Sequence, residues 1–235
     1  MGEDWDASAA AWLDEQREAG DFARQYVLDG PMQARVLAAA PRDVLDIGCG
    51  EGRFCRWLRG QGIRAVGIDP PRALLEAARA RDPEGDYREG RAEALDFPDA
   101  SFDMAVFYLT LIDIEGWQAA LTEAQRVLRP GGRILIANLQ PYNSASVENW
   151  SIQPDGSAQI HMARYLEEHP RWVAWRDMRI VNWHRPLSTY MTALLDAGLT
   201  LIWFAEPEPT GGPERKQIRG RHAPYFLAME WQMPG

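Results

Sequence analysis

The sequence contains few cysteines, no long apolar run and no excess of positive charge. Its two cysteines, Cys49 and Cys55, lie close together, and neither belongs to a Cys/His cluster with the spacing of a zinc site. No apolar stretch approaches the ~20 residues that a membrane-spanning helix needs. The first residues also lack the basic and apolar regions of a secretion signal. We therefore expect a cytoplasmic protein with no structural disulfide, no metal site and no membrane partner.

The net charge of −9 argues against a nucleic-acid partner, because contacts with phosphates require a basic face. One basic run, residues 214–221, follows a Pro-Thr-Gly-Gly-Pro segment, and this pattern is typical of an exposed, mobile loop. The 235 residues, of which 46% are hydrophobic, suffice for one domain with a substantial core. Composition leaves both a monomer and a homodimer open.

Apolar strands and amphipathic helices alternate along most of the chain. Seven strands are expected, near residues 43–47, 65–68, 85–89, 102–108, 133–138, 199–204 and 225–231. Alternation at this spacing predicts an α/β protein with a parallel, doubly wound sheet and right-handed crossovers.

Two segments fall outside this alternation. Residues 1–40 have helical spacing and are expected to form an N-terminal helical lid. Residues 140–185 hold Trp150, Trp172, Trp175 and Trp183, and are expected to form an aromatic insertion over the active site. These aromatic side chains either line a substrate pocket or form the insertion's own small core. We assign all 235 residues to a single domain.

Residues 44–52, Val-Leu-Asp-Ile-Gly-Cys-Gly-Glu-Gly, form a strand that enters a glycine-rich turn before a helix. A dinucleotide-binding fingerprint requires a further glycine where Arg53 stands. The Asp46 carboxylate would repel a pyrophosphate but suits a ligand that carries an ammonium group. Asp69 ends the second strand, where an acid can accept both ribose hydroxyls of an adenosine. The ligand predicted by these residues is an adenosine that bears an ammonium group and no phosphate.

The sequence resembles the class I S-adenosylmethionine-dependent methyltransferases, and most closely their type 11 group, which includes quinone-biosynthesis enzymes. The resemblance rests on four motifs, at residues 44–52, 67–69, 91–103 and 127–132. It implies a Rossmann-like seven-stranded sheet, mostly parallel with one antiparallel C-terminal strand. It also implies that the cofactor is S-adenosylmethionine, with S-adenosylhomocysteine as the product. Many relatives carry an aspartate that binds the adenine amino group where Arg91 stands, so this contact must differ here.

The resemblance also implies which residues bind the cofactor. The matching positions are Asp46, Gly48, Cys49, Gly50, Asp69, Pro70, Ala92, Glu93, Ala94, Tyr108 and Leu109. In the N-terminal segment, Arg24 or Tyr26 could reach the cofactor carboxylate, although a helix that packs Tyr26 into the core is an equal alternative.

Methyl transfer needs orientation more than a fixed catalytic signature, so the acceptor side is less defined in the sequence. His184 is our first candidate for a general base, with Tyr108 and Asn138 as further catalytic candidates. Alternatively, His184 is bonded to backbone and Arg185 to an acid. The candidates for substrate binding are Asp113, Tyr142, Tyr165, Trp183, Arg185 and Tyr190.

These features favour methyl transfer to O, N or C of a small molecule, without nucleic acid. Three alternatives remain open: a non-methylating reaction of S-adenosylmethionine such as intramolecular cyclisation, a non-catalytic cofactor-binding module, and a nucleotide-dependent oxidoreductase.

Overall fold

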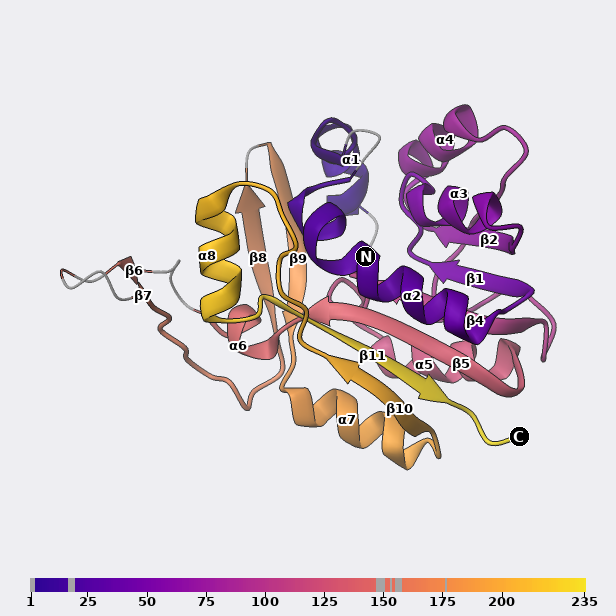
Figure 1. The fold of residues 1–235 in the computed structure, drawn as a ribbon. Coiled ribbons are helices and arrows are strands. Elements are labelled where there is room, and N and C mark those ends of the chain that lie inside the picture. The colour runs from indigo at the N-terminus through magenta and orange to yellow at the C-terminus, as the bar shows by residue number, and fades with distance from the viewer. Residues whose placement is uncertain (1–2, 17–19, 147–150, 153, 155–157, 176) are drawn as a thin grey trace.

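A seven-stranded sheet forms the centre of the computed structural model, which describes residues 3–16, 20–146, 151–152, 154, 158–175 and 177–235 (Figure 1). Its strand order is β10-β11-β5-β4-β1-β2-β3. The strands are β1 (Asp43–Ile47), β2 (Arg64–Asp69), β3 (Asp86–Glu89), β4 (Phe102–Tyr108), β5 (Leu128–Leu139), β10 (Thr200–Ala205) and β11 (Phe226–Gln232). β11 is antiparallel to both of its neighbours, and the other strands run in one direction. The predicted fold class, including one antiparallel C-terminal strand, is confirmed.

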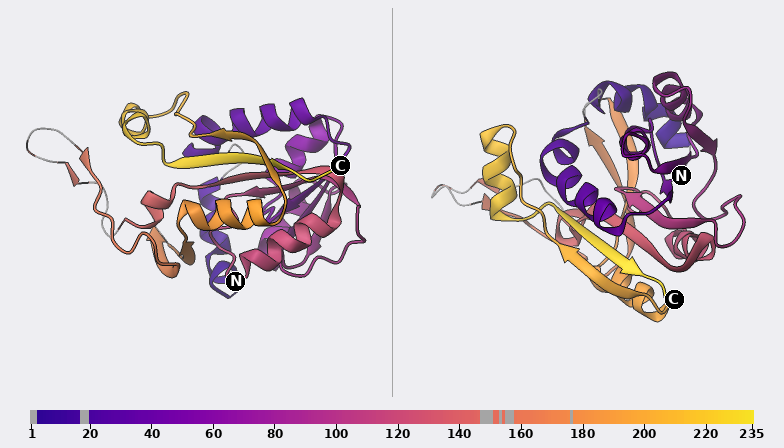
Figure 2. Two further views of the ribbon diagram at one scale, coloured as in Figure 1. Left: turned by 90° about the horizontal axis from the view of Figure 1, so that it is seen from below. Right: turned by 45° about the vertical axis from the view of Figure 1, so that its right-hand side comes forward.

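Helices cover both faces of this sheet (Figure 2). One face carries α2 (Asp29–Ala39), α3 (Arg53–Gly60) and α4 (Arg72–Arg81), and the other carries α5 (Trp117–Val127) and α7 (Leu187–Asp196). Successive strand residues point to opposite faces. On β4, for example, Val106 packs under the first group of helices and Phe107 under the second. The central strands β1 and β4 are therefore mostly apolar, as a sheet covered on both faces requires.

The N-terminal helix α1 (Glu3–Gln16) lies across the carboxyl-terminal ends of the strands. It packs between α4 and a β-hairpin, where Trp5 and Ala9 meet Leu74 and Ile180. The hairpin consists of β8 (His169–Trp175) and β9 (Met178–His184). A short π-helix, η1 (Arg24–Leu28), connects this region to α2.

The segment from residue 140 to residue 185 holds α6 (Pro141–Ser144) and the two-stranded pairs β6 (Ser151–Ile152) with β7 (Ala158–Gln159), and β8 with β9. The β6–β7 pair projects away from the sheet (Figure 1). Trp150 lies outside the described residues. Trp172 and Trp175 belong to β8, whose alternating exposure shows that only one side of the hairpin packs against the protein.

The prediction of a loop at residues 214–221 was wrong, because these residues belong to helix α8 (Glu214–His222). Pro213 precedes the first turn, a favourable position because proline lacks the N–H that a helix start leaves unpaired. Within the described part of the chain, no helix combines the length and the apolar character that crossing a bilayer demands.

Candidate functional site

Three small, adjoining hollows lie where β1, β2 and β4 end, and residues of α1 line two of them. All three are lined by Gly48, the first glycine of the predicted loop. The first also contains Asp46 and Arg24, the second contains Asp69 and Asp113, and the third contains Pro70 and Ala92. In parallel sheets with helices on both faces, ligands bind at this carboxyl edge. Because they share lining residues, we treat the three hollows as one candidate site.

The glycine loop can approach this site closely because its glycines adopt backbone angles that side chains disfavour. Gly48, Gly50 and Gly52 have φ values of 77°, 56° and 75°. A Cβ atom on Gly48 would lie 2.2 Å from Cγ2 of Thr110. The amide of Gly48 donates to the carbonyl of Ile68 at 2.8 Å, which fastens the loop to the end of β2.

Asp46 places an incompletely bonded carboxylate at the bottom of the first hollow. Its side chain is 1% exposed, and Oδ2 accepts a hydrogen bond from Sγ of Cys55 at 3.4 Å. Oδ1 has no hydrogen-bond partner among the described residues. Burial raises the pKa of Asp46 to about 7, against the lowering effect of the Cys55 contact. A buried acceptor of this kind fits a ligand that brings its own cationic donor.

Asp69 closes the second strand beside the glycine loop. Its Oδ2 accepts a hydrogen bond from the amide of Gly50 at 2.7 Å, so the loop fixes the carboxylate. Burial raises the pKa of Asp69 to about 7, and the charge of Asp46 contributes to the increase. The two acids thus lie on either side of the loop, as a ligand with an ammonium group and vicinal hydroxyls requires.

The third hollow contains most of the residues expected at an adenine. Pro70, Ala92 and Glu93 line it, whereas Ala94 is exposed and outside the lining. Arg91 also lines this hollow and forms an ion pair with Glu93 at 2.9 Å. Position 91, where many relatives carry an aspartate, is therefore occupied by an arginine that pairs with Glu93.

At the end of β4, Tyr108 borders the first two hollows and Leu109 borders the second. Leu109 has a φ of 60°, an uncommon conformation for a side chain of this size. The Tyr108 hydroxyl donates to Asp29 at 2.7 Å, and Arg53 holds the same carboxylate through two hydrogen bonds of 2.7 Å. Burial raises the pKa of Tyr108, which keeps the phenol neutral.

Arg24 brings a cation from η1 to the first two hollows. Its guanidinium lies 4.8 Å from the ring centroid of Trp12 and forms an ion pair with Asp21 at 3.1 Å. Tyr26 was the other residue considered for the cofactor carboxylate. Its ring instead lies against Gly211 and Gly212, in the segment before α8. The structure therefore brings only Arg24 to the glycine loop.

Trp5 and Trp12 line the hollows from α1, although the sequence indicated only their helical spacing. Their rings meet edge to face with centroids 5.4 Å apart. Nε1 of Trp5 is buried without a partner among the described residues, so the site contains an unused donor as well as an unused acceptor. No pattern in the sequence indicates which side of α1 faces the loop.

His184 does not meet the geometric requirements of a general base. Its side chain is 0% exposed, and both ring nitrogens are hydrogen-bonded, Nδ1 to Ser144 Oγ at 2.7 Å and Nε2 to the carbonyl of Tyr165 at 2.8 Å. Burial lowers the pKa of His184, which favours the neutral ring. The structure thus agrees with the alternative role of His184, in which the side chain is hydrogen-bonded to backbone.

Arg185 is also structural. It is 1% exposed, and its guanidinium donates to Glu168 and to the carbonyls of Leu111, Ile114 and Glu115 at 2.7 to 3.2 Å. Its guanidinium cannot form a bidentate contact with a substrate carboxylate, because its N–H groups already donate to carbonyls of the β4–α5 loop. The guanidinium lies over the ring of Trp183, with 5.2 Å to its centroid.

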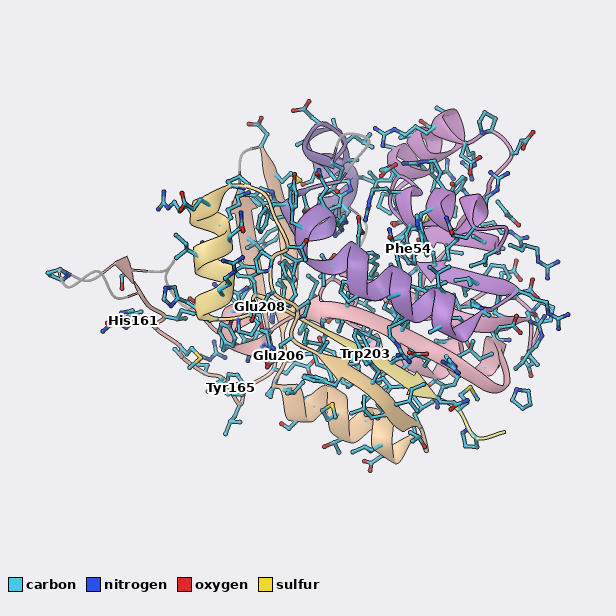
Figure 3. The ribbon with its side chains drawn as sticks, viewed as in Figure 1. Phe54, His161, Tyr165, Trp203, Glu206 and Glu208 are labelled. Atoms are coloured by element: carbon cyan, nitrogen blue, oxygen red, sulfur yellow. The ribbon has the colours of Figure 1, made fainter. Side chains whose placement is uncertain are left out.

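The remaining candidates are dispersed. Tyr190 and Asn138 are buried at 2% and 1% exposure and belong to the packing beside Trp117. The hydroxyl of Tyr142 bonds the carbonyl of Pro224. Tyr165 lies on the segment before β8, far from Phe54 beside the glycine loop (Figure 3). Of the substrate-binding candidates, Asp113 lines the hollows. Among the described residues, no group of three or more His, Cys, Asp or Glu side chains is placed to hold a metal ion.

Comparison with known proteins finds similarity to methyltransferases. Residues 45–136 match a family described as "Methyltransferase domain". The chain is 31% identical over 149 residues to the malonyl-(acyl-carrier protein) O-methyltransferase of Serratia marcescens, covering 62% of this chain and 58% of that protein. It is 35% identical over 111 residues to the demethylmenaquinone methyltransferase of Thermus thermophilus, covering 45% of this chain and 50% of that one. The chain thus spans about half the length of these curated relatives.

A solved structure matches over more of the chain. The S-adenosylmethionine-dependent methyltransferase of Mesorhizobium loti is 28% identical, with a TM-score of 0.75, and the match covers 87% of this chain and 99% of that one. The similarity therefore extends beyond the glycine loop to the whole arrangement of strands and helices.

Proposed function

We propose that this chain, whose residues 45–136 match a methyltransferase family, transfers a methyl group from S-adenosylmethionine to O, N or C of a small molecule. The observation that carries the proposal is the unpartnered Oδ1 of buried Asp46, beside a glycine loop that also fixes Asp69. A pyrophosphate would be repelled by these two acids, whereas an amino acid joined to a nucleoside complements both.

The residues fit this cofactor along its whole length. Asp46 would hold the ammonium group, and Arg24 the carboxylate, in exchange for its present partner Asp21. Asp69 would accept the ribose hydroxyls, and the hollow lined by Ala92 and Glu93 would take the adenine. S-adenosylmethionine supplies an activated methyl group on a sulfonium, so the protein needs to add orientation and exclusion of water.

The first 40 residues would act as the lid of this site. The three hollows measure only about 10 to 50 Å³ in the closed arrangement seen here. Cofactor binding would therefore require α1 to move outward, away from the β8–β9 hairpin and α4 on which it packs. Once closed, Trp5 and Trp12 would exclude water from the reacting atoms.

On the acceptor side, Asp113 is the titratable candidate that lines the hollows, beside Tyr108 at the end of β4. The buried Tyr108 would shape the methyl group's surroundings as a neutral phenol. A small acceptor fits the acidic protein better than a nucleic acid, because the net charge is −9.

Incubation with S-adenosylmethionine carrying a deuterated methyl group tests the proposal. The purified chain is mixed with a cellular metabolite extract, and mass spectrometry follows both the labelled acceptor and the nucleoside product. We expect a labelled small molecule together with S-adenosylhomocysteine. Release of methylthioadenosine would instead support intramolecular cyclisation, and no consumption of the cofactor above a heat-inactivated control would contradict catalysis.

A further inference from the structure

A larger hollow lies next to the cofactor site. None of the residues predicted to bind the substrate lines it. It has a volume of about 300 Å³, within the range of small-molecule sites. It lies between η1, the segment before α8, α8 itself and the start of β11. Its apolar wall consists of Phe22, Val27, Pro207, Pro209, Tyr225 and Phe226.

Two cations of α8 stand at this hollow. Nζ of Lys216 lies 4.9 Å from the ring centroid of Phe22, and Cζ of Arg219 lies 5.5 Å from that of Tyr225. Both side chains are exposed, and although burial lowers the pKa of Arg219, its guanidinium stays charged at neutral pH. Cations drawn over apolar rings in this way form an anion-binding rim above an apolar floor.

Two of the three acids near the hollow have partners of their own. Asp21 lines the hollow and is held by Arg24, and Glu206 is hydrogen-bonded by the amide of Gln140. Glu208 lies near α8 (Figure 3) and is exposed. The side chains that remain directed at the hollow are thus apolar or cationic.

The hollow also adjoins the cofactor site. Asp21 lines the hollow, and its partner Arg24 lines the two hollows that contain Asp46 and Asp69. One ion pair of 3.1 Å therefore separates the two spaces. If the cofactor carboxylate takes the guanidinium, as proposed above, this separation is released when the cofactor binds. Asp21 then keeps the hydrogen bonds from the amide of Arg24 at 2.9 Å and from Nε2 of Gln16 at 3.4 Å.

We infer that this hollow is the acceptor site and that the acceptor is an amphipathic anion, with an apolar body against Phe22 and Tyr225 and an acidic group at Lys216 and Arg219. The inference rests on the proposed function and names the substrate class of that function. It replaces the expectation that the aromatic insertion at residues 140–185 binds the acceptor.

Two fluorescent probes of similar shape test the class of ligand. One is the anion 1-anilinonaphthalene-8-sulfonate, and the other is the uncharged N-phenyl-1-naphthylamine. We expect the double variant Lys216→Ala/Arg219→Ala to bind the anion about tenfold more weakly, with little change for the uncharged probe. The matched control is Arg215→Ala/Arg221→Ala, which removes two exposed charges from the same helix and leaves the hollow intact. Equal losses in the two double variants would overturn the inference.

A filling variant locates the probes. Ala23→Phe places a ring in the hollow and is expected to weaken both probes, while circular dichroism verifies that it folds. Saturating S-adenosylhomocysteine should leave both probes bound, because the cofactor and the acceptor would occupy hollows with different lining residues. Displacement of the probes by S-adenosylhomocysteine, or unchanged binding in Ala23→Phe, would place them elsewhere and overturn the inference.

The labelled-methyl incubation links the hollow to turnover. We expect the labelled product to be retained by an anion-exchange resin, and to fall about tenfold in Lys216→Ala/Arg219→Ala but not in the matched control. An uncharged product would overturn the inference and leave the proposed function intact. If no product forms at all, the proposed function fails, and the probe measurements alone decide what the hollow binds.

Discussion

Asp46 is the residue on which the electrostatics of the cofactor site depend. Its carboxylate is buried, has a pKa near 7 and leaves one oxygen without a protein partner. A neighbouring Asp69 with a pKa near 7 means that ionising both acids together is unfavourable until a cation arrives. The site is therefore arranged to gain most from a ligand that brings an ammonium group.

The raised pKa of Asp46 predicts how cofactor affinity depends on pH. An ammonium group binds the ionised carboxylate, and below its pKa the acid must first lose a proton, so the affinity falls as the pH decreases. We expect binding of S-adenosylhomocysteine to strengthen from about pH 5.5 to pH 7 and to level off above about pH 8. Calorimetry across this range tests the prediction.

The Asp46→Asn variant should bind S-adenosylhomocysteine more weakly at pH 8. Its affinity should also depend less steeply on pH, and the dependence that is left should arise from Asp69. Asp196→Asn, an exposed substitution at the end of α7, should retain the profile of the unmodified chain. An affinity that stays constant over this range, or that rises as the pH falls, would be incompatible with ammonium binding at Asp46.

Gly48 gives a steric test of the same loop. A Cβ atom there would lie 2.2 Å from Thr110, at a φ of 77° that L-residues disfavour. We expect Gly48→Ala to displace the loop and to weaken S-adenosylhomocysteine binding at least about 100-fold, because the loop also orients Asp69. Gly60→Ala, whose Cβ would meet nothing within 4 Å, is the matched control. Equal binding by both variants would show that the loop does not form the site.

At the scale of elements, Arg185 joins the end of β9 to the β4–α5 loop. Its contacts with three carbonyls satisfy backbone groups that would otherwise be buried without partners. We expect Arg185→Ala to lower the free energy of unfolding by about 3 kcal/mol, or roughly 6–12 °C in Tm. Thermal unfolding followed by circular dichroism measures this change.

The control for Arg185 is Arg221→Ala on the surface of α8, which should change the stability by less than about 1 kcal/mol. A role in substrate binding would give a different result. In that case Arg185→Ala would leave Tm unchanged and reduce only the methylation of the acceptor.

The elements themselves could be predicted because each carries its own signal. Val44, Leu45 and Ile47 are apolar because both faces of the sheet are covered, and the glycines mark the turn that follows. Asp69 could be placed because parallel strands end at one edge. The site residues that lie close to a strand end were therefore within reach of sequence reasoning.

Residues whose role depends on distant packing could not be placed in this way. The burial of His184 results from Ser144 and Tyr165, which lie about 20 to 40 residues away along the chain. Trp5 and Trp12 reach the site only because α1 packs on Leu74 and Ile180. α8 was missed because a Gly/Pro-rich segment and a high charge are typical of loops as well as of exposed helices.

At the scale of the whole molecule, the N-terminal segment borders both the cofactor hollows and the larger hollow. α1 covers the cofactor hollows, and η1 separates them from the larger hollow under α8. The N-terminal 40 residues would thus control access to both, whereas the sheet supplies a fixed base. Activity would depend on this segment even though it precedes the glycine loop in the sequence.

Binding of S-adenosylhomocysteine by isothermal titration calorimetry tests cofactor use at this site most directly. The unmodified chain should bind one equivalent, and Asp69→Ala should bind about 100-fold more weakly, because two hydrogen bonds to a charged group are lost. Asp196→Ala should bind as the unmodified chain does. The absence of binding by the unmodified chain, or equal affinity in Asp69→Ala, would contradict a cofactor held between the glycine loop and the end of β2.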